Sequence, residues 1–186
     1  MTDNDRELLT FDSRAKWRAW LIAHHANAAE AWLVIYKTGP RKSALTLHDA
    51  QEEALCFGWI EVSNKRLDAG RYALRFTPRK SGSAWSISNI RRVEKLSAAG
   101  VMTDAGLQKV AEAQRNGQWA LALQVEATDR IPDDLAKGLR RHRGALAGYR
   151  NLSRSRKRQI LRGLLSVKSA ATRQRRIDAI VQEVLA

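Results

Sequence analysis

The hydrophobic positions of the first part of the chain switch repeatedly between helical and strand spacing. Trp17, Trp20 and Leu21 share one face at a spacing of three to four residues, which predicts a helix over Arg14–Ala26. The run Ala31–Lys37 is apolar throughout and rich in aromatic and β-branched residues, so it predicts a buried strand. A second helix is expected over 47–57, with Thr46 as its N-cap.

Two further segments have strand character and are separated by a short turn. Trp59–Leu67 and Arg71–Thr77 alternate in side-chain direction and flank a turn with aspartate and glycine, which predicts an antiparallel hairpin. Pro78 has no N–H for the strand ladder and is expected to end it. The earlier apolar strand, Ala31–Lys37, is expected to join this hairpin as a third strand.

Helical spacing continues from about Ser86 to the end of the chain. Thr103 and Ser153 are expected to begin helices, and Pro132 fits the first position of another. An apolar set at helical spacing closes the chain: Ile177, Ile180, Val181 and Val184. The predicted fold class is therefore α+β, with a small antiparallel sheet of about three strands packed with helices, followed by an all-helical C-terminal section.

Charge is spread unevenly over the 186 residues, which carry a formal net charge of +14. Residues 1–120 hold 18 Lys/Arg against 13 Asp/Glu, a net +5, whereas residues 121–186 hold 15 against 6, a net +9. All six tryptophans lie in the first section. These shifts predict an α+β domain over 1–120 and a basic helical section over 121–186. The basic excess attracts anionic partners or serves only solubility, and the sequence does not decide between the two.

Several functional classes find no support in the sequence. The single cysteine, Cys56, excludes an internal disulfide framework and is expected to be a buried thiol. No apolar run approaches a membrane span, and Met1–Thr10 is polar and acidic, so we expect a cytoplasmic protein. The basic turn at Thr38–Ser43 lacks the spacing of a phosphate loop. No zinc spacing, hydrolase elbow or dinucleotide fingerprint occurs, so neither a metal nor a cofactor is predicted.

The residue types hardest to explain by packing alone gather within Ala54–Asn89. Arginine is a planar, bidentate donor for carboxylate or phosphate, and a tryptophan can stack on a ligand. The segment therefore predicts a surface that binds a small anionic or peptidic ligand without catalysis. The candidate ligand-binding residues are Trp59, Glu61, Arg75, Arg79, Lys80, Trp85 and Asn89.

Each of these residues also has a plainer interpretation. Glu61 could form a structural ion pair with Arg75 or Arg79 across the hairpin, or it could act as a catalytic acid or base if the neighbouring indole desolvates it. Trp85 is as readily explained as a core residue. An enzyme that uses Glu61 is therefore an alternative hypothesis, with no identified catalytic residue beyond it.

The basic C-terminal section supports a different alternative, a nucleic-acid-binding protein. Arg173, Arg175 and Arg176 would supply phosphate contacts from the last helix. No recognisable nucleic-acid-binding module accompanies them, so this hypothesis depends on charge alone. The oligomeric state is not predicted.

Several runs of sequence together resemble a known family of bacterial proteins. They are ALCFGWIE at Ala54–Glu61, RYALRFTPRKSGSAW with SISN at Arg71–Asn89, GVMTDAG at Gly100–Gly106, LSRSRKRQIL at Leu152–Leu161 and TRQRRI at Thr172–Ile177. In combination they resemble the YdeI/OmpD-associated family, also labelled bacteriocin-protection, over nearly the whole chain.

The sequence departs from the pattern of that family at Glu61, where aspartate is more frequent, at Leu47, where tyrosine is common, and at Val101, where a basic residue is frequent. The family supplies no established reaction or catalytic residues. It implies a role in tolerance of antimicrobial peptides or envelope stress.

Overall fold

A computed structural model of the protein describes residues 7–37, 45–128 and 130–186. Contacts divide the chain into two compact units. The N-terminal unit consists of the described residues up to Ser83 together with Ser88–Asn116. The C-terminal unit consists of Ala84–Ile87 together with Gly117–Ala186. The turn predicted at Thr38–Ser43 lies outside the described residues.

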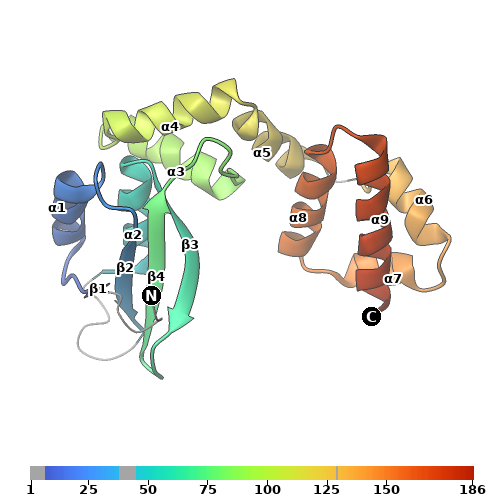
Figure 1. Ribbon diagram of the computed structural model, residues 1–186, viewed down its shortest axis with the longest axis horizontal. Coiled ribbons are helices and arrows are strands. Elements are labelled where there is room, and N and C mark those ends of the chain that lie inside the picture. The colour runs from blue at the N-terminus through green and yellow to red at the C-terminus, as the bar shows by residue number, and fades with distance from the viewer. Residues whose placement is uncertain (1–6, 38–44, 129) are drawn as a thin grey trace. The chain divides into compact units, whose positions relative to one another are not determined.

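A mixed sheet forms the centre of the N-terminal unit (Figure 1). Its strands are β1 (Leu8–Leu9), β2 (Ala31–Tyr36), β3 (Trp59–Arg66) and β4 (Arg71–Pro78), in the order β1-β2-β4-β3. The predicted hairpin β3–β4 is confirmed, and β2 joins β4 antiparallel as expected. β1, which pairs parallel to β2, was not predicted because two residues carry no periodicity. It makes the sheet mixed rather than antiparallel.

Strand alternation separates the polar residues of the hairpin onto two faces. Glu61 lies opposite Phe76 in the ladder, whereas Arg75 lies opposite Ser63 beyond an irregularity in β3. Consecutive residues of a strand point to opposite faces. Arg75 therefore faces away from the side of the sheet that Phe76 and Glu61 share.

Over its described residues, this unit has four helices beside the sheet. They are α1 (Arg14–His24), α2 (Leu47–Cys56), α3 (Ile87–Ala98) and α4 (Asp104–Arg115). The N-caps predicted at Thr46 and Thr103 are confirmed, because each hydroxyl group accepts a backbone N–H three residues along. Ser13 caps α1 in the same way. Such caps satisfy N–H groups that have no partner within the helix.

Aromatic side chains join α1 and α2 to the sheet. Trp17 is fully buried, its ring lies 5.7 Å from that of Phe76, and its Nε1 donates to the carbonyl of Ala50 at 3.1 Å. Trp20 stacks on Trp17 and meets Trp59 edge-on, with ring centroids 6.0 Å apart. Trp17 thus belongs to the core and the half-buried Trp20 packs on it, and together they hold α1 and α2 against the face of the sheet that carries Glu61.

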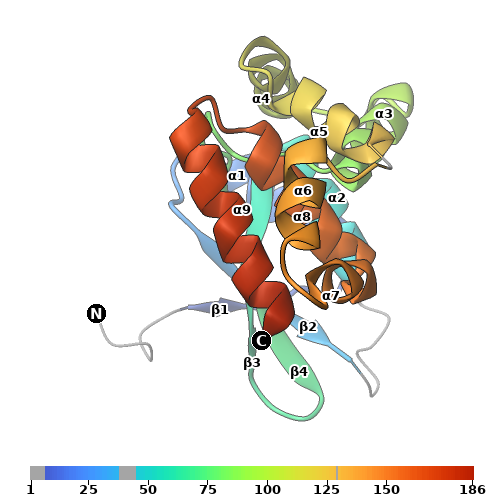
Figure 2. The ribbon, with the colours of Figure 1, turned by 90° about the vertical axis from the view of Figure 1, so that its right-hand side faces the viewer.

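The C-terminal unit is helical, as predicted. Its helices are α5 (Gln118–Ala127), α6 (Asp133–Arg140), α7 (Ala145–Asn151), α8 (Arg154–Leu165) and α9 (Ala170–Leu185). α9 lies alongside α6 and α8 (Figure 2), and their apolar faces form one core with Ile177, Ile180 and Val181 at its centre. Pro132 precedes α6 at the N-cap instead of occupying its first position, a difference of one residue.

The predicted α+β class, a small sheet packed with helices and followed by a helical C-terminal section, is confirmed. None of the helices in the described parts of the chain has the length and apolar character needed to cross a membrane.

Candidate functional site

A cavity of about 130 Å³ opens in the N-terminal unit, beside the start of β3 and the end of β4. Four of the seven predicted ligand-binding residues line it: Trp59, Glu61, Arg79 and Asn89. The structure therefore brings together residues that are 30 positions apart, from two strand ends and one helix.

The start of β3 positions two of these side chains. Gly58 has a φ of 73° and turns the chain from α2 into the strand. Trp59 follows with 1% exposure, and its Nε1 donates to the carbonyl of His25 at 3.1 Å. Glu61 accepts a hydrogen bond of 2.7 Å from Nε2 of Gln51 on α2. The indole forms a fixed apolar wall, and the carboxylate is oriented by an amide.

Arg79 is the most deeply buried cation of the cavity. Its backbone N–H donates to the carbonyl of Gly58 at 2.9 Å, which ties it to the start of β3 beyond the end of β4. Arg79 as a whole is only 3% exposed to solvent. Burial lowers the pKa of Arg79 to about 10, so the guanidinium is still charged at neutral pH.

Four further residues line the cavity and were not singled out in the sequence: Gln51, Leu55, Ile60 and Arg92. Arg92 follows Asn89 by three positions on α3, and residues three apart share a helix face. That spacing was the available signal for Arg92. Gln51 offered none, because its approach to Glu61 depends on how α2 packs against β3.

The lining gives the cavity a defined chemical character. Two guanidinium groups, from Arg79 and Arg92, supply donors suited to a carboxylate or phosphate. Asn89 and Gln51 offer amide groups, which both donate and accept. Among the described residues of the lining, Glu61 is the single carboxylate. The arrangement can bind an anionic group, and Glu61 would favour a ligand that carries a donor or a positive charge next to that group.

Arg75 and Lys80 are not part of this cavity. Arg75 lies on the opposite face of the sheet, where its Nε and Nη2 pair with Glu30 at 2.7 and 2.6 Å and its guanidinium lies 6.0 Å from the ring centroid of Trp32. The alternation of β4 is the reason. Lys80 is exposed and follows Arg79 outside the lining.

Trp85 belongs to the C-terminal unit and not to the cavity. It is 3% exposed, and its ring lies 5.2 Å from that of Trp119. Its carbonyl accepts a hydrogen bond from Arg162 of α8. Because α3 begins at Ile87, Trp85 precedes the helix and does not share a helical face with Asn89. The interpretation of Trp85 as a packing residue is the one its contacts favour.

Buried carboxylates of α2 form an ion-pair cluster with cations of α1 and α3, and the sequence analysis did not predict it. Glu52 and Glu53 are 1% and 3% exposed. Arg14 of α1 donates to Glu53 at 2.6 Å and to Glu52 at 2.9 Å, Arg18 donates to Glu53 at 2.7 Å, and Lys95 donates to Glu52 at 3.0 Å. Burial lowers the pKa of Arg14, but the two carboxylates outweigh it and leave that pKa above its ordinary value.

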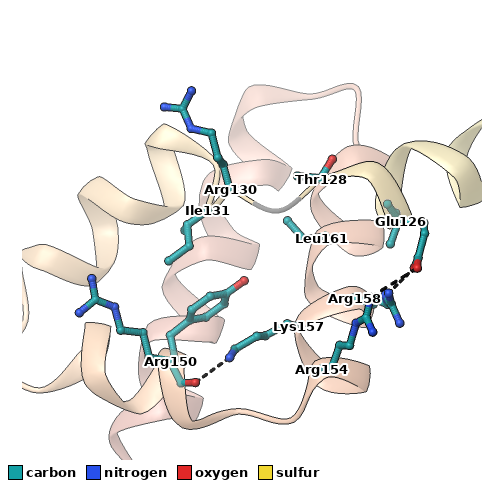
Figure 3. Close-up of a pocket in the computed structure, with 11 residues that line it drawn as sticks. Glu126, Thr128, Arg130, Ile131, Arg150, Arg154, Lys157, Arg158 and Leu161 are labelled. Carbon is teal, nitrogen blue, oxygen red and sulfur yellow. Dashed lines mark hydrogen bonds and ion pairs between the residues drawn. The ribbon is translucent and has the colours of Figure 1, made fainter.

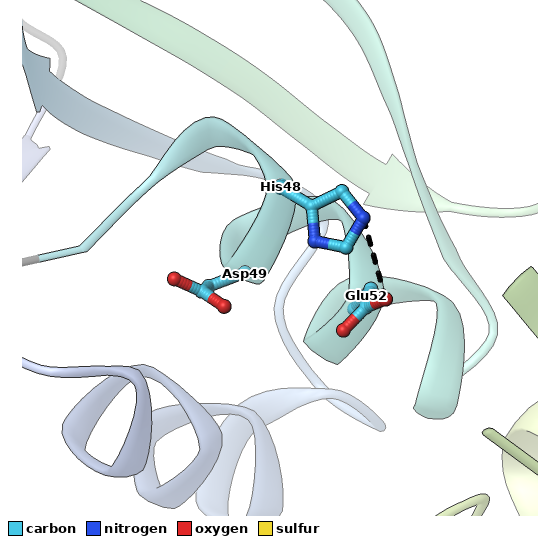
Figure 4. Close-up of side chains that lie close together, drawn as sticks. All are labelled: His48, Asp49 and Glu52. Atoms are coloured by element: carbon cyan, nitrogen blue, oxygen red, sulfur yellow. Dashed lines mark ion pairs between the residues drawn. The ribbon is translucent and has the colours of Figure 1, made fainter. Parts of the chain in front are cut away.

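Part of this cluster has the composition of a metal site. The ligand atoms of His48, Asp49 and Glu52 lie within 4.8 Å of one another (Figure 4). Arg14, however, donates to Asp49 at 3.1 Å as well as to Glu52, and Lys95 also donates to Glu52. These cations occupy the carboxylate oxygens that a metal ion would need. The group is therefore a structural ion-pair cluster.

The thiol of Cys56 is fully buried, as predicted. Burial raises its pKa, so the thiolate form is disfavoured at neutral pH. Cys56 contributes to the packing of α2 and not to the lining of the cavity.

The arginines of the last helix differ in their surroundings. Arg173 donates to Asp134 through Nε and Nη2, at 2.5 and 3.1 Å, and to the carbonyl of Leu164 at 2.7 Å. Arg176 donates to the carbonyl of Gly163. Arg175 contacts the hydroxyl of Thr172 at 3.2 Å. Arg173 thus joins three elements of the C-terminal unit.

We expect Arg173→Ala to lower the free energy of unfolding of the C-terminal unit by about 1 kcal/mol, because it removes a two-pronged ion pair and a helix-end contact. Arg175→Ala on the same helix is the matched control and should change it by less than about 0.5 kcal/mol. Thermal unfolding followed by circular dichroism measures both. Equal effects would mean that the contacts of Arg173 do not stabilise the unit.

Comparisons with known families divide the chain at a similar place to the fold. A family described as "Domain of unknown function (DUF8412)" matches residues 9–109. A second, described as "Bacteriocin-protection, YdeI or OmpD-Associated", matches residues 130–186. The resemblance noted in the sequence is thus supported in the C-terminal section only, whereas the runs from Ala54 to Gly106 fall within the first match. No curated protein and no solved structure matches the chain significantly.

Proposed function

We infer the function of this chain, which belongs to the family described as "Domain of unknown function (DUF8412)", from the site itself. We propose that the N-terminal unit binds the anionic group of a small molecule or peptide, without catalysis, in the cavity at Arg79. The description of the family that matches residues 130–186 supports bacteriocin protection as the setting in which such binding would operate.

The burial of Arg79 is the observation that carries this proposal. Moving a cation out of water raises its free energy, and the lowered pKa of Arg79 expresses that penalty. A carboxylate or phosphate in the cavity would interact with this guanidinium at low local dielectric, where the attraction is stronger than in water. Occupancy by an anion is therefore favoured at this position.

The size of the cavity limits what it can hold. Its volume of about 130 Å³ is well below the roughly 300–1,000 Å³ typical of pockets for drug-sized ligands. It accommodates an anionic group and its nearest atoms, and the rest of a larger ligand would extend over the rim. A free carboxylic acid or a peptide C-terminus fits this description.

Replacing Arg79 with methionine tests the proposal. We expect Arg79→Met to weaken the binding of a small carboxylate or phosphate at least about tenfold, because a charge-assisted hydrogen bond contributes about 1.5–3 kcal/mol. Methionine is long and apolar, so it fills the buried space and keeps the unit folded. Lys80→Met is the matched control: it removes an adjacent positive charge that does not line the cavity, and it should leave affinity unchanged.

Isothermal titration at fixed ionic strength, with acetate, inorganic phosphate and glycine as probes, measures these affinities. Glu61→Gln then separates two kinds of ligand, because it removes a negative charge from the lining. It should strengthen binding of acetate and weaken binding of glycine if the ammonium group of glycine contacts Glu61. Equal affinities for Arg79→Met and Lys80→Met with every probe would overturn the proposal.

A further inference from the structure

The C-terminal unit contains a larger concavity, of about 290 Å³, lined from the end of α5 and from α7 and α8 (Figure 3). Among the described residues that line it, five side chains are cationic and one is a carboxylate, so this part of the lining is strongly basic. These side chains are Arg130, Arg150, Arg154, Lys157, Arg158 and Glu126. Part of the excess of positive charge in this section, seen in the sequence, therefore lies around a hollow in the surface.

The charged groups are arranged unevenly around this concavity. Glu126 pairs with Arg154 at 3.5 Å and with Arg158, so its negative charge is held at one end. Lys157 extends the other way and donates to the carbonyl of Arg150 at 2.6 Å (Figure 3). No carboxylate within the described residues forms an ion pair with Lys157 or Arg150. The ammonium group has three donors, so Lys157 can contact an anion while it keeps this hydrogen bond.

Apolar side chains complete the lining. Val125, Tyr149 and Leu161 are 4%, 3% and 6% exposed, and they form a wall below the charged rim. Burial raises the pKa of Tyr149, so its phenol is neutral at physiological pH and adds no negative charge. An apolar wall combined with a few polar groups is the usual composition of a small-molecule site.

We propose that this concavity binds a small amphipathic anion, with an aromatic or short aliphatic body against Val125 and Tyr149 and a phosphate or carboxylate group at Lys157 and Arg150. The volume of about 290 Å³ suits a single ring with one anionic substituent. The positive charges supply attraction, and the apolar wall selects against inorganic anions, which have nothing to bury. This site is separate from the cavity at Arg79 and does not depend on it.

The test uses full-length protein with the Arg79→Met substitution, so that the first cavity does not contribute. Binding of 4-fluorophenyl phosphate is followed by ¹⁹F NMR, with inorganic phosphate and 4-fluorophenol as partial ligands. We expect the aryl phosphate to bind at least about fivefold more tightly than either partial ligand, because only it uses both the cations and the apolar wall. Equal binding of inorganic phosphate and aryl phosphate would overturn the proposal.

A pair of double variants locates the binding. Arg150→Gln with Lys157→Gln should weaken aryl phosphate binding at least about fivefold. Arg141→Gln with Arg143→Gln is the control, because both residues are exposed, lie in the same unit and do not line the concavity. Equal losses in both double variants, or displacement of the aryl phosphate by a short thymidine oligonucleotide at equal phosphate concentration, would mean a non-specific basic surface and would overturn the assignment.

Discussion

Gly106→Ala is expected to destabilise the N-terminal unit by about 2–3 kcal/mol. Gly106 lies inside α4, and a Cβ at this position would lie 2.2 Å from the carbonyl oxygen of Cys56. That oxygen is backbone at the end of α2 and cannot rotate away. The helix would have to move outward, which disturbs packing at a cost typical of overpacked cores.

The magnitude is the balance of two effects. Alanine favours a helix interior over glycine by about 1 kcal/mol, which opposes the loss. The shift of α4 would also disturb the bond of 2.7 Å from the hydroxyl of Thr103 to the same Cys56 carbonyl. Because a contact of 2.2 Å with fixed backbone is far inside van der Waals distance, the steric effect is the larger.

Gly163→Ala is the matched control, since Gly163 also lies inside a helix, α8. Its added Cβ would meet only the end of the Arg176 side chain, at 3.6 Å, which is ordinary contact. Helix propensity then predicts a gain of about 0.5–1 kcal/mol. Urea unfolding followed by circular dichroism and tryptophan fluorescence measures both variants. If Gly106→Ala proved as stable as Gly163→Ala, the result would contradict the close approach of α4 to the backbone at the end of α2.

This close approach also affects the candidate site. Ala105 and Lys109 of α4 contact the position of Gly58, where a Cβ would lie 3.0 Å and 2.8 Å from their atoms. Gly58 leads directly into Trp59, and its carbonyl accepts the N–H of Arg79. Displacement of α4 should therefore weaken anion binding at Arg79 as well as stability.

The elements of the fold were predictable because their signals are local. The caps at Thr46 and Thr103 and the alternation of Arg71–Thr77 depend on residues within a few positions of one another. The pairing of β1 with β2 joins Leu8 to Trp32, and a two-residue strand is too short to show a pattern that predicts it.

The candidate site was predictable in part for the same reason. Trp59 and Glu61 share a face by strand alternation, and that was visible in the sequence. Strand alternation also explains why Arg75 is not part of the site: it is adjacent to Phe76, so its side chain lies on the face of the sheet opposite to Phe76 and Glu61. Trp85 could not be placed, since its assignment depends on long-range contact with Trp119. The burial of Arg79 likewise follows from tertiary packing and not from its neighbours in sequence.

Arg14→Ala is expected to lower the free energy of unfolding of the N-terminal unit by about 2–3 kcal/mol at pH 7. It removes hydrogen bonds to Glu52 and Glu53, which are almost fully buried. Loss of one partner of a buried ion pair costs about 3–5 kcal/mol. The expected loss is smaller because the side chain of Arg14 is 39% exposed, and Arg18 and Lys95 keep their bonds to the two carboxylates.

Lys16→Ala is the matched control on the same helix. Lys16 pairs with Asp12, and both side chains are well exposed, at 64% and 65%. Such a pair contributes little, so the loss should stay below about 0.5 kcal/mol. Urea unfolding followed by tryptophan fluorescence measures both variants, because four of the six tryptophans lie in this unit.

The loss of stability caused by Arg14→Ala should also depend on pH, because it depends on the ionisation of the carboxylates that Arg14 contacts. Burial raises the pKa of Glu52, but hydrogen bonds from Lys95 and Arg14 outweigh it and leave the pKa below its ordinary value of 4.5. A carboxylate with a lowered folded pKa stabilises the fold above that ordinary value, and this stabilisation is lost as pH falls through the folded pKa. Wild type should therefore lose stability below about pH 4.5.

Protonation of Glu52 removes one of the charges that Arg14 contacts, so the gap between wild type and Arg14→Ala should narrow from about 2–3 kcal/mol at pH 7 as the pH falls to 3. The gap between wild type and Lys16→Ala should stay small throughout. A gap for Arg14→Ala that is the same at both pH values would mean that Arg14 stabilises the unit through the packing of its aliphatic stem, since that contact does not titrate.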